Sequence, residues 1–162
     1  MSVMTSPSTV LYPARKGPRP FTADDLWAIP RVGAPVVAPD GRTLAVPVTT
    51  YEIDKNEGRG RIWLVPAAGG EPRALTAPEH SSQQPAFSPD GRQLAFTRKT
   101  EKGKSQLFVM PVDGGEPSRL TDLPLGMFDP KWLPDGSGIV FGAMVLKGHF
   151  TPEATAAELE RR

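Results

Sequence analysis

A Pro-Asp-Gly tripeptide occurs three times in this chain of 162 residues, and each copy is followed by a run rich in apolar residues. The copies are Pro39-Asp40-Gly41, Pro89-Asp90-Gly91 and Pro134-Asp135-Gly136, so their spacings are 50 and 45 residues. Proline presets φ for a tight turn, aspartate can bond its own backbone, and glycine accepts positive φ. Each tripeptide therefore predicts a turn between two strands, and its recurrence predicts a repeated structural unit.

A second marker recurs at the same period. Gly69-Gly70 and Gly114-Gly115 are each followed by Glu-Pro and then by Leu-Thr, and the two copies are 45 residues apart. The five residues that lengthen the first spacing therefore lie between Thr49 and Arg61, and the polar segment 50–60 is predicted to be a long hairpin loop. A period in the mid-forties with four short strands per unit is typical of propeller blades.

The predicted fold is all-β: a partial β-propeller of two complete four-stranded blades and part of a third, with short helices near both ends. We expect strands at 34–38, 44–50, 61–66 and 72–76, then at 83–87, 93–98, 105–111 and 117–121, and finally at 129–133 and 138–145. Pro47 lies within the second of these strands and predicts a bulge or an early end to pairing there.

The same pattern divides the chain into segments. Residues 1–20 are predicted to be a flexible leader, and 21–32 a short helix, capped by Thr22, with the stretch that leads into the sheet. The blades are expected at 33–78, 79–123 and, incomplete, 124–146. Residues 147–162 are expected to form a loop and a helix, capped by Thr151 and starting at Pro152, that continues into further sequence.

The number of blades carries a consequence for the whole protein. Propellers close with roughly four to eight blades, whereas this chain has room for about three at 45 residues each. An open ring would leave a strand edge and an apolar blade face uncovered. We therefore expect these residues to be a truncation or a fragment of a longer polypeptide.

Composition excludes several kinds of function. The formal net charge is +1, which gives no long-range field to attract nucleic acid or a membrane surface. The chain has no Cys, so disulfide and thiolate chemistry are absent. Residues 1–20 lack the apolar core of a secretory signal, and cytoplasmic residence is the expectation. No cofactor or metal is predicted, because the two His residues, His80 and His149, lie far apart in the sequence.

Few residues invite a catalytic interpretation. His80 with Ser82 lies in a polar connection between units, and adjacent loop residues rarely have triad geometry. The three turn aspartates recur in equivalent positions, so a turn role explains them without chemistry. Trp63, Phe108 and Trp132 are expected in the core between blades. A Gly-x-Ser-x-Gly nucleophile elbow is absent from the sequence, so no catalytic residue is predicted.

The segment 50–60 is the best candidate for recognition, because loops on rigid scaffolds often carry it. Two interpretations stay open: a solvated hairpin tip, or a contact to a second domain or subunit. The charged and polar residues concerned are Glu52, Asp54, Lys55, Glu57 and Arg59.

Over residues 33–143, the repeat of Pro-Asp-Gly, apolar strand, Gly-Gly-Glu-Pro and Leu-Thr resembles TolB-type, WD40-like propeller repeats. The preceding Phe21-Thr-Ala-Asp-Asp-Leu-Trp27, followed by Arg31-Val32, is similar to the start of acylaminoacyl-peptidase-like and dipeptidyl-peptidase-like members of the prolyl oligopeptidase family. The helix-forming interruption at 147–162 also resembles an insertion within the propeller of that family.

That resemblance implies a serine peptidase whose N-terminal propeller restricts access to a C-terminal α/β-hydrolase domain with a Ser-Asp-His triad. The chain would then be a non-catalytic, substrate-gating segment, and the hydrolysis of short or N-blocked peptides would take place outside it. The implied partners are the remaining blades, the hydrolase domain, short peptides and further copies of the protein. The alternatives are a TolB-like interaction propeller without enzyme activity and a propeller fused to an amidohydrolase.

Overall fold

The second repeat folds into a four-stranded antiparallel sheet in the order β6-β7-β8-β9, so neighbours in sequence are neighbours in space. Its strands are β6 (Ser82–Phe87), β7 (Gln93–Lys99), β8 (Ser105–Pro111) and β9 (Ser118–Arg119). The computed structural model describes residues 17 and 20–161. The predicted leader therefore lies almost entirely outside the described residues.

The first repeat forms a sheet of five strands, because its inner strand is split in two. β1 (Arg31–Val32) and β2 (Val36–Val37) both pair with β3 (Thr43–Glu52), which pairs with β4 (Glu57–Pro66), followed by β5 (Arg73–Ala74). The sheet thus begins at Arg31, two residues before the boundary at 33 that the repeat predicts.

The prediction of a long loop at 50–60 is wrong. Pairing between β3 and β4 continues without a break from Thr43↔Pro66 to Glu52↔Glu57. Only a short tip joins the strands, made of a 3₁₀ turn, η1 (Ile53–Lys55), and Asn56 in the left-handed region at φ 49°. The five extra residues of the first repeat therefore lengthen a hairpin instead of forming an irregular loop.

Pro47 does not produce the predicted bulge. It pairs with Ile62 in continuous register. The N–H and C=O of one residue in a strand point to the same side, and the Pro47 carbonyl accepts a hydrogen bond from Gly33 N–H at 2.8 Å. The missing proline N–H therefore points toward the gap between β1 and β2, and the β3–β4 ladder loses no bond.

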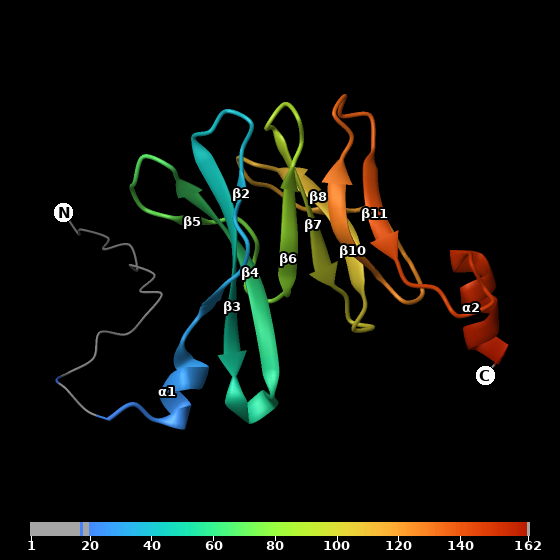
Figure 1. Cartoon of the computed structure of the whole chain (residues 1–162), viewed down its shortest axis with the longest axis horizontal. Helices are drawn as coiled ribbons and strands as arrows, with labels where there is room; N and C mark the ends of the chain where they lie inside the picture. The colour runs from blue at the N-terminus through green and yellow to red at the C-terminus, as the bar shows by residue number, and fades with distance from the viewer. Residues whose placement is uncertain (1–16, 18–19, 162) are drawn as a thin grey trace, which may run out of the picture.

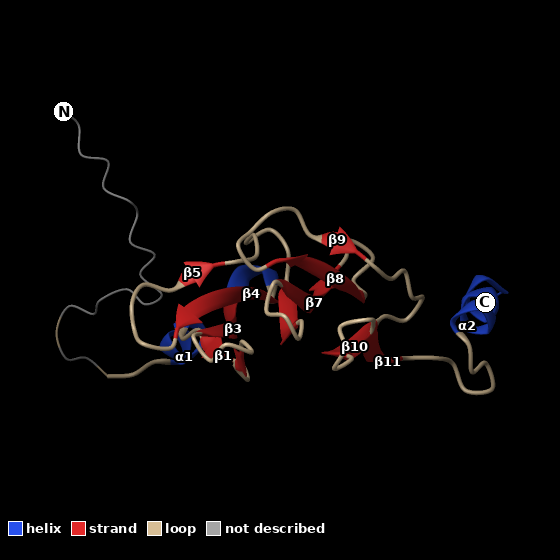
Figure 2. Cartoon of the chain, turned by 90° about the horizontal axis from the view of Figure 1, so that it is seen from above, coloured by secondary structure: helices blue, strands red, loops and turns tan. Residues whose placement is uncertain are grey.

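The third repeat contributes two strands, β10 (Met127–Trp132) and β11 (Ile139–Ala143), in a sheet of their own. The helices are α1 (Ala23–Ala28), beside the lower end of β3, and α2 (Pro152–Arg161), which lies beyond β11 and apart from it (Figures 1 and 2). The three sheets stand side by side as an open arc, as the blade count predicts. Neither helix is long or apolar enough to cross a bilayer, and the described residues contain no other α-helix.

The inner strands carry a feature that recurs with the blades. The β6–β7 register shifts between Gln83 and Ala86, and the β10–β11 register shifts between Phe128 and Lys131. Gln84 and Asp129 occupy these bulges at φ 51° and 52°, and Asp129 N–H donates to Gln84 Oε1 at 3.1 Å. A proline follows each one, as Pro35 follows the split between β1 and β2. Each inner strand is therefore kinked at one repeat position.

The core lies between the blades, because each sheet buries its faces against its neighbours. The larger cluster joins blades one and two, and Phe96 and Phe108 stack in it with ring centroids 6.1 Å apart. Its buried members are Ala38, Ala45, Ile62, Leu64, Leu75, Phe87, Leu94, Phe96 and Met110. The smaller cluster joins blades two and three through Ala86, Ala95, Leu107 and Met127.

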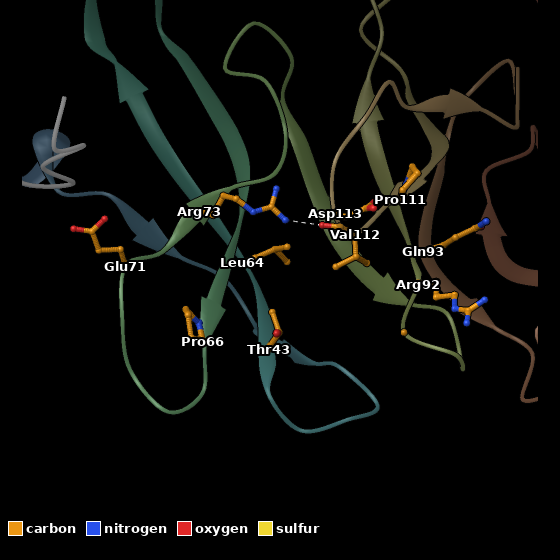
Figure 3. Close-up of a pocket in the computed structure, with 11 residues that line it drawn as sticks. Thr43, Leu64, Pro66, Glu71, Arg73, Arg92, Gln93, Pro111, Val112 and Asp113 are labelled. Atoms are coloured by element: carbon orange, nitrogen blue, oxygen red, sulfur yellow. Dashed lines mark hydrogen bonds between the residues drawn. The ribbon is translucent and has the colours of Figure 1, made fainter. Parts of the chain in front are cut away.

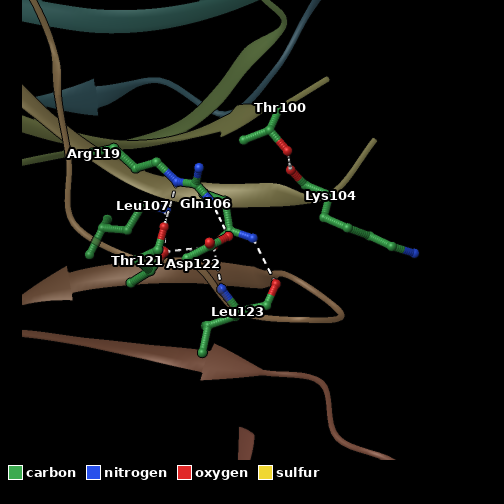
Figure 4. A network of polar contacts seen from close by, with 8 residues as sticks. All are labelled: Thr100, Lys104, Gln106, Leu107, Arg119, Thr121, Asp122 and Leu123. Atoms are coloured by element: carbon green, nitrogen blue, oxygen red, sulfur yellow. Dashed lines mark hydrogen bonds and ion pairs between the residues drawn. The ribbon is translucent and has the colours of Figure 1, made fainter. Parts of the chain in front are cut away.

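Each blade leads into the next through a threonine. Thr76 Oγ1 accepts Ile62 N–H at 3.0 Å, and Thr121 Oγ1 accepts Leu107 N–H at 2.9 Å. In blade two, buried Gln106 accepts from Thr121 Oγ1 at 2.8 Å and exchanges two bonds with the Leu123 backbone (Figure 4). These hydrogen bonds hold Thr121 and Leu123, at the start of the link to blade three, against β8.

Candidate interaction face

The two faces of the arc differ in how closely they follow the repeat. One, here called the turn face, carries the three Pro-Asp-Gly turns, at the upper side of Figure 1. The other, the connection face, carries α1, the β3–β4 tip and the links that lead into each new blade. The three repeats form the same turns on the turn face, whereas on the connection face each blade carries different segments.

On the turn face the three tripeptides form the same turn. The glycine N–H donates to the carbonyl three residues earlier at 2.9 Å in every copy, from Gly41, Gly91 and Gly136, all with φ near 70°. Asp40, Asp90 and Asp135 each accept the N–H two residues on, at 2.9 to 3.0 Å. The three aspartate carboxylates are thus engaged in hydrogen bonds within their own turns.

Hydrogen bonds within these turns lower the pKa values of two of the aspartates. Hydrogen bonds from the Ser88 hydroxyl and the Arg92 N–H hold the pKa of Asp90 below its usual value. The Ser137 hydroxyl and N–H lower the pKa of Asp135 in the same way. Both carboxylates are fully exposed. They are therefore structural acceptors of hydrogen bonds, and a general acid would need the opposite shift.

The Gly-Gly pairs make the second kind of turn on this face. Gly69 and Gly114 N–H donate to the carbonyls of Pro66 and Pro111 at 3.1 and 3.2 Å. All four glycines, Gly69, Gly70, Gly114 and Gly115, have positive φ, between 88° and 130°. Glycine adopts this backbone without steric cost.

A cavity of about 850 Å³ opens between blades one and two at this face (Figure 3). Arg73 crosses it, and its guanidinium donates to the Val112 carbonyl at 2.6 Å. Its lining follows the repeat: Glu71 and Pro66 here correspond to Glu116 and Pro111 in the next groove, between blades two and three. The cavity is therefore a gap of the kind expected between any two neighbouring blades, and it is not a feature specific to blades one and two.

The lengthened hairpin projects from the connection face, and the five candidate residues lie at its end. Lys55 Nζ is 2.7 Å from Glu52 Oε1, and this hydrogen bond lowers the pKa of Glu52. Arg59 pairs more loosely with Glu57 at 3.4 Å, and Asp54 is exposed in the 3₁₀ turn. The tip therefore presents both charge signs to its surroundings.

Helix α1 supports this hairpin through contacts that sequence reasoning missed. The Trp27 and Tyr51 rings meet edge to face with centroids 5.8 Å apart, and the Arg31 guanidinium lies 4.7 Å from the Tyr51 ring centroid. Gly58 lies opposite Tyr51, where an added Cβ would come within 3.0 Å of the ring. The glycine thus leaves room for the aromatic ring, and the N-terminal helix holds the extension in place.

Two hollows open on this face, and the first of them borders the hairpin. One, of about 630 Å³, lies between the tip and blade two and is polar, with Glu57, Arg59, Glu79, His80 and Lys99 among its lining residues. The other, of about 590 Å³, lies between blades two and three and mixes the Gln83 and Gln84 amides with Phe128 and Met144. Gly103 lines both.

The described residues show no arrangement for covalent or metal catalysis. Ser82 is buried, and its Oγ lies 3.4 Å from Arg98 Nε, while Ser81 Oγ accepts Gly60 N–H. His149 lies in the turn before α2, where its carbonyl accepts the Thr155 hydroxyl at 2.9 Å. Within residues 20–161, no three His, Asp or Glu side chains converge as metal ligands.

The sequence profile of the TolB beta propeller domain matches residues 29–155. The chain belongs to this family. Its match covers all three repeats and the first turn of α2, so the family accounts for both complete blades and for the incomplete one.

Similar proteins include enzymes. The chain is 40% identical over 81 residues to the uncharacterized peptidase YuxL of Bacillus subtilis, a match that covers 50% of this chain and 12% of that protein. The AtxE2 isopeptidase structure aligns with a TM-score of 0.64 and 21% identity, over 88% of this chain and 25% of that one. The structure of an acylaminoacyl peptidase bound to Z-Gly-Gly-Phe-chloromethyl ketone aligns with a TM-score of 0.59 and 18% identity. This match covers 69% of this chain and 17% of that one. The TolB propeller fold is thus similar to parts of much longer peptidases.

Proposed function

We propose that this chain is part of the substrate-gating propeller of a serine peptidase that acts on short or N-blocked peptides. The observation that carries the proposal is the 40% identity over 81 residues to a protein named as a peptidase. The propeller supplies no nucleophile within residues 20–161, so catalysis belongs to an α/β-hydrolase domain elsewhere in the polypeptide. That domain would use a serine activated by a histidine base, and an oxyanion hole.

The connection face is where we place the catalytic domain and the path of the peptide. Insertions that interrupt a repeat map to loops on one face of such proteins, often the binding face. Here the lengthened hairpin, α1 and the two hollows all belong to that face. The charged tip residues Glu52 and Lys55 would contact the hydrolase domain or a second copy of the protein.

The remaining partners follow from the same proposal. Further blades would complete the ring, so that only peptides short enough to enter it reach the serine. Cytoplasmic residence is part of the proposal, since short peptides arise there from protein turnover. The +1 net charge supports a small peptide over nucleic acid as the ligand.

The test uses the full-length polypeptide that contains this chain. A fluorophosphonate probe should label the whole protein at a serine outside residues 1–162 and leave this chain alone unlabelled. N-acetylated dipeptide and tripeptide anilides should be hydrolysed, whereas a 30-residue peptide should not. Absence of labelling together with absence of peptide hydrolysis would overturn the proposal in favour of an interaction propeller or another hydrolase.

The gating role has its own test in the hairpin. Replacing residues 51–58 by Asn-Gly joins Thr50 to Arg59 through a two-residue turn and removes the extension. We expect this variant to hydrolyse the 30-residue peptide or to change its oligomeric mass by light scattering. The matched control, Lys102→Ala, removes an exposed charge from the turn between β7 and β8 and leaves the hairpin intact. An unchanged substrate range and mass in the shortened variant would remove the hairpin from the proposal.

A further inference from the structure

The outer edge of β4, on the side away from β3, is covered along only part of its length. β5 pairs with it at Trp63 and Leu64, and Thr76 Oγ1 accepts the Ile62 N–H at 3.0 Å. Nearer the tip, no strand of the described chain pairs with this edge, and residues 57–61 have a strand on one side only. The lengthened hairpin thus carries β4 beyond the end of β5.

The backbone register shows which groups the uncovered edge presents. In an antiparallel pair, residues bonded to the partner strand alternate with residues whose N–H and C=O point away from it. Ile62 is of the second kind, because its N–H donates to Thr76 Oγ1 on the outer side. Two residues on, the Gly60 N–H also donates outward, to Ser81 Oγ at 3.1 Å. Since the pairing with β3 is continuous, the N–H and C=O of Gly58 point outward as well.

These two groups of Gly58 meet a hollow instead of a partner. Within residues 20–161, neither the outward N–H nor the outward C=O of Gly58 has a hydrogen-bond partner. Gly58 is exposed and lines the polar hollow of about 630 Å³ between the tip and blade two. Lys99 and Gly103, at the ends of the turn between β7 and β8, belong to the same lining. Unpaired backbone groups of an edge strand are a template for a further extended chain.

The charges of the hollow indicate what kind of molecule it suits. Lys99, Glu79 and Glu101 line it, and none of the three forms an ion pair with another residue of the described chain. A nucleic acid would require cations alone, and an apolar ligand would bury these charges without partners. A peptide offers amide donors and acceptors along its whole length and can carry charges of both signs.

The size of the hollow favours a single chain over a folded partner. Sites for small ligands have volumes of about 300–1,000 Å³, and this hollow lies within that range. A few residues of one extended chain fit such a space. The edge strand of a second copy would bring the rest of its sheet with it, toward the turn between β7 and β8.

We propose that the outer edge of β4 binds an extended peptide by strand addition at Gly58, inside the polar hollow. The Gly58 N–H donates to a carbonyl of the peptide, and the Gly58 C=O accepts a peptide N–H. Main-chain hydrogen bonds supply the affinity in this mode of recognition, so the site accepts peptides of varied sequence. The inference rests on the proposed function in taking the ligand to be a peptide, and it names the backbone groups that hold it.

The first experiment tests which edge of the peptide is bound. The probe is acetyl-Thr-Val-Thr-Val-Thr-Lys-amide with fluorescein on the lysine, and its binding to the full-length polypeptide is measured by fluorescence anisotropy after fluorophosphonate treatment. Methyl groups on alternate amide nitrogens block one edge of an extended chain and leave the other intact. Of two peptides methylated at the first and third or at the second and fourth residues, one should bind at least about tenfold more weakly and the other within about threefold of the parent.

The second experiment removes the donor from the protein. Gly58→Pro and Gly58→Ala both add a Cβ, which would lie 3.0 Å from the Tyr51 ring, but only proline removes the N–H. Position 58 makes no hydrogen bond to β3, so neither variant breaks the hairpin ladder, as Pro47 shows for the opposite strand. Gly58→Pro should bind the parent peptide at least about tenfold more weakly than Gly58→Ala, with circular dichroism confirming that both variants fold. If the proline variant does not fold, the methylated peptides decide alone.

Equal binding of the two methylated peptides would overturn the inference, as would equal binding by the two Gly58 variants. Absence of peptide binding, with a molecular mass that falls in Gly58→Pro but not in Gly58→Ala by light scattering, would assign the edge to a second copy and overturn it too. Peptide hydrolysis that neither methylation nor the variants affect would overturn the strand addition and leave the proposed function standing. Edge-dependent binding without hydrolysis or fluorophosphonate labelling would support the strand addition and overturn the proposed function.

Discussion

The repeat allows one core position to be compared with itself, through Phe96→Ala and Phe141→Ala. Both phenylalanines belong to the second strand of their unit, 45 residues apart, so strand propensity and backbone effects nearly cancel. Phe96 is fully buried, stacks on Phe108 at 6.1 Å and lies 5.3 Å from the Arg98 guanidinium. Phe141 is half-buried beside the open groove.

The expected losses differ accordingly. Truncation of a fully buried phenylalanine costs about 3–5 kcal/mol, from lost transfer free energy and from the cavity left behind. At Phe141 part of the side chain is already in water and solvent can fill the space, so the loss should be about 1–2 kcal/mol. Phe96→Ala should therefore lower the free energy of unfolding by roughly 2 kcal/mol more than Phe141→Ala.

Urea unfolding followed by far-ultraviolet circular dichroism measures both values, provided that m is unchanged between the variants. If Phe96→Ala leaves too little folded protein, Phe96→Leu and Phe141→Leu give the same comparison at lower cost. Equal losses at the two positions would refute the reasoning, because the junction between blades two and three would then be as well covered as the first.

Three further predictions concern backbone contacts and pH. Thr76→Val should lower stability by about 1–3 kcal/mol by leaving the buried Ile62 N–H without its acceptor, while Thr76→Ser should largely keep it, both measured by urea unfolding. Pro47→Ala should change stability by no more than about 1 kcal/mol, because no β3–β4 bond depends on position 47; a larger loss would contradict the pairing described here. The Ser137 hydrogen bonds lower the folded pKa of Asp135, so their stabilisation is present above the unfolded pKa of about 3.9 and is lost as the pH falls through the folded value. Asp135→Asn should therefore flatten the fall of the urea midpoint between about pH 5 and 2, and an unaltered pH profile would contradict that assignment.

The strands of blade two were predictable because the sequence marks both of their ends. Turns at Pro89-Asp90-Gly91 and Gly114-Gly115 bound apolar runs that two neighbouring blades cover, and β7 and β8 lie within a residue of their predicted bounds. The hairpin extension was mistaken for a loop because a hairpin in solvent needs no apolar alternation. Its signal was the run Thr49-Thr50-Tyr51, which is rich in strand-forming residues.

Other features differ in whether any sequence signal existed. The inner-strand bulges were readable, since a proline recurs at 35, 85 and 130 with the same spacings as the turns. The contact of Trp27 with Tyr51 could not be predicted from the sequence. It joins residues 24 positions apart and depends on the orientation of α1, which no local sequence pattern determines. Pro47 misled because the sequence shows a missing N–H but not the side of the strand to which it would have pointed.

A comparison of the three repeats distinguishes residues that maintain the fold from residues that could recognise a ligand. A ligand on the turn face would meet nearly the same hydrogen-bonded turn in every blade, with aspartates already committed to their own backbone. A ligand on the connection face meets a different surface at each blade: an aromatic and arginine contact beside the first, a polar hollow beside the second, and Phe128 with Met144 beside the third. Discrimination between substrates needs groups that differ in place and chemistry. The connection face is the side of this propeller that offers them. Under the proposed gating function, variants there should change the substrate range of the full-length protein, whereas variants of the Pro-Asp-Gly turns should change its stability.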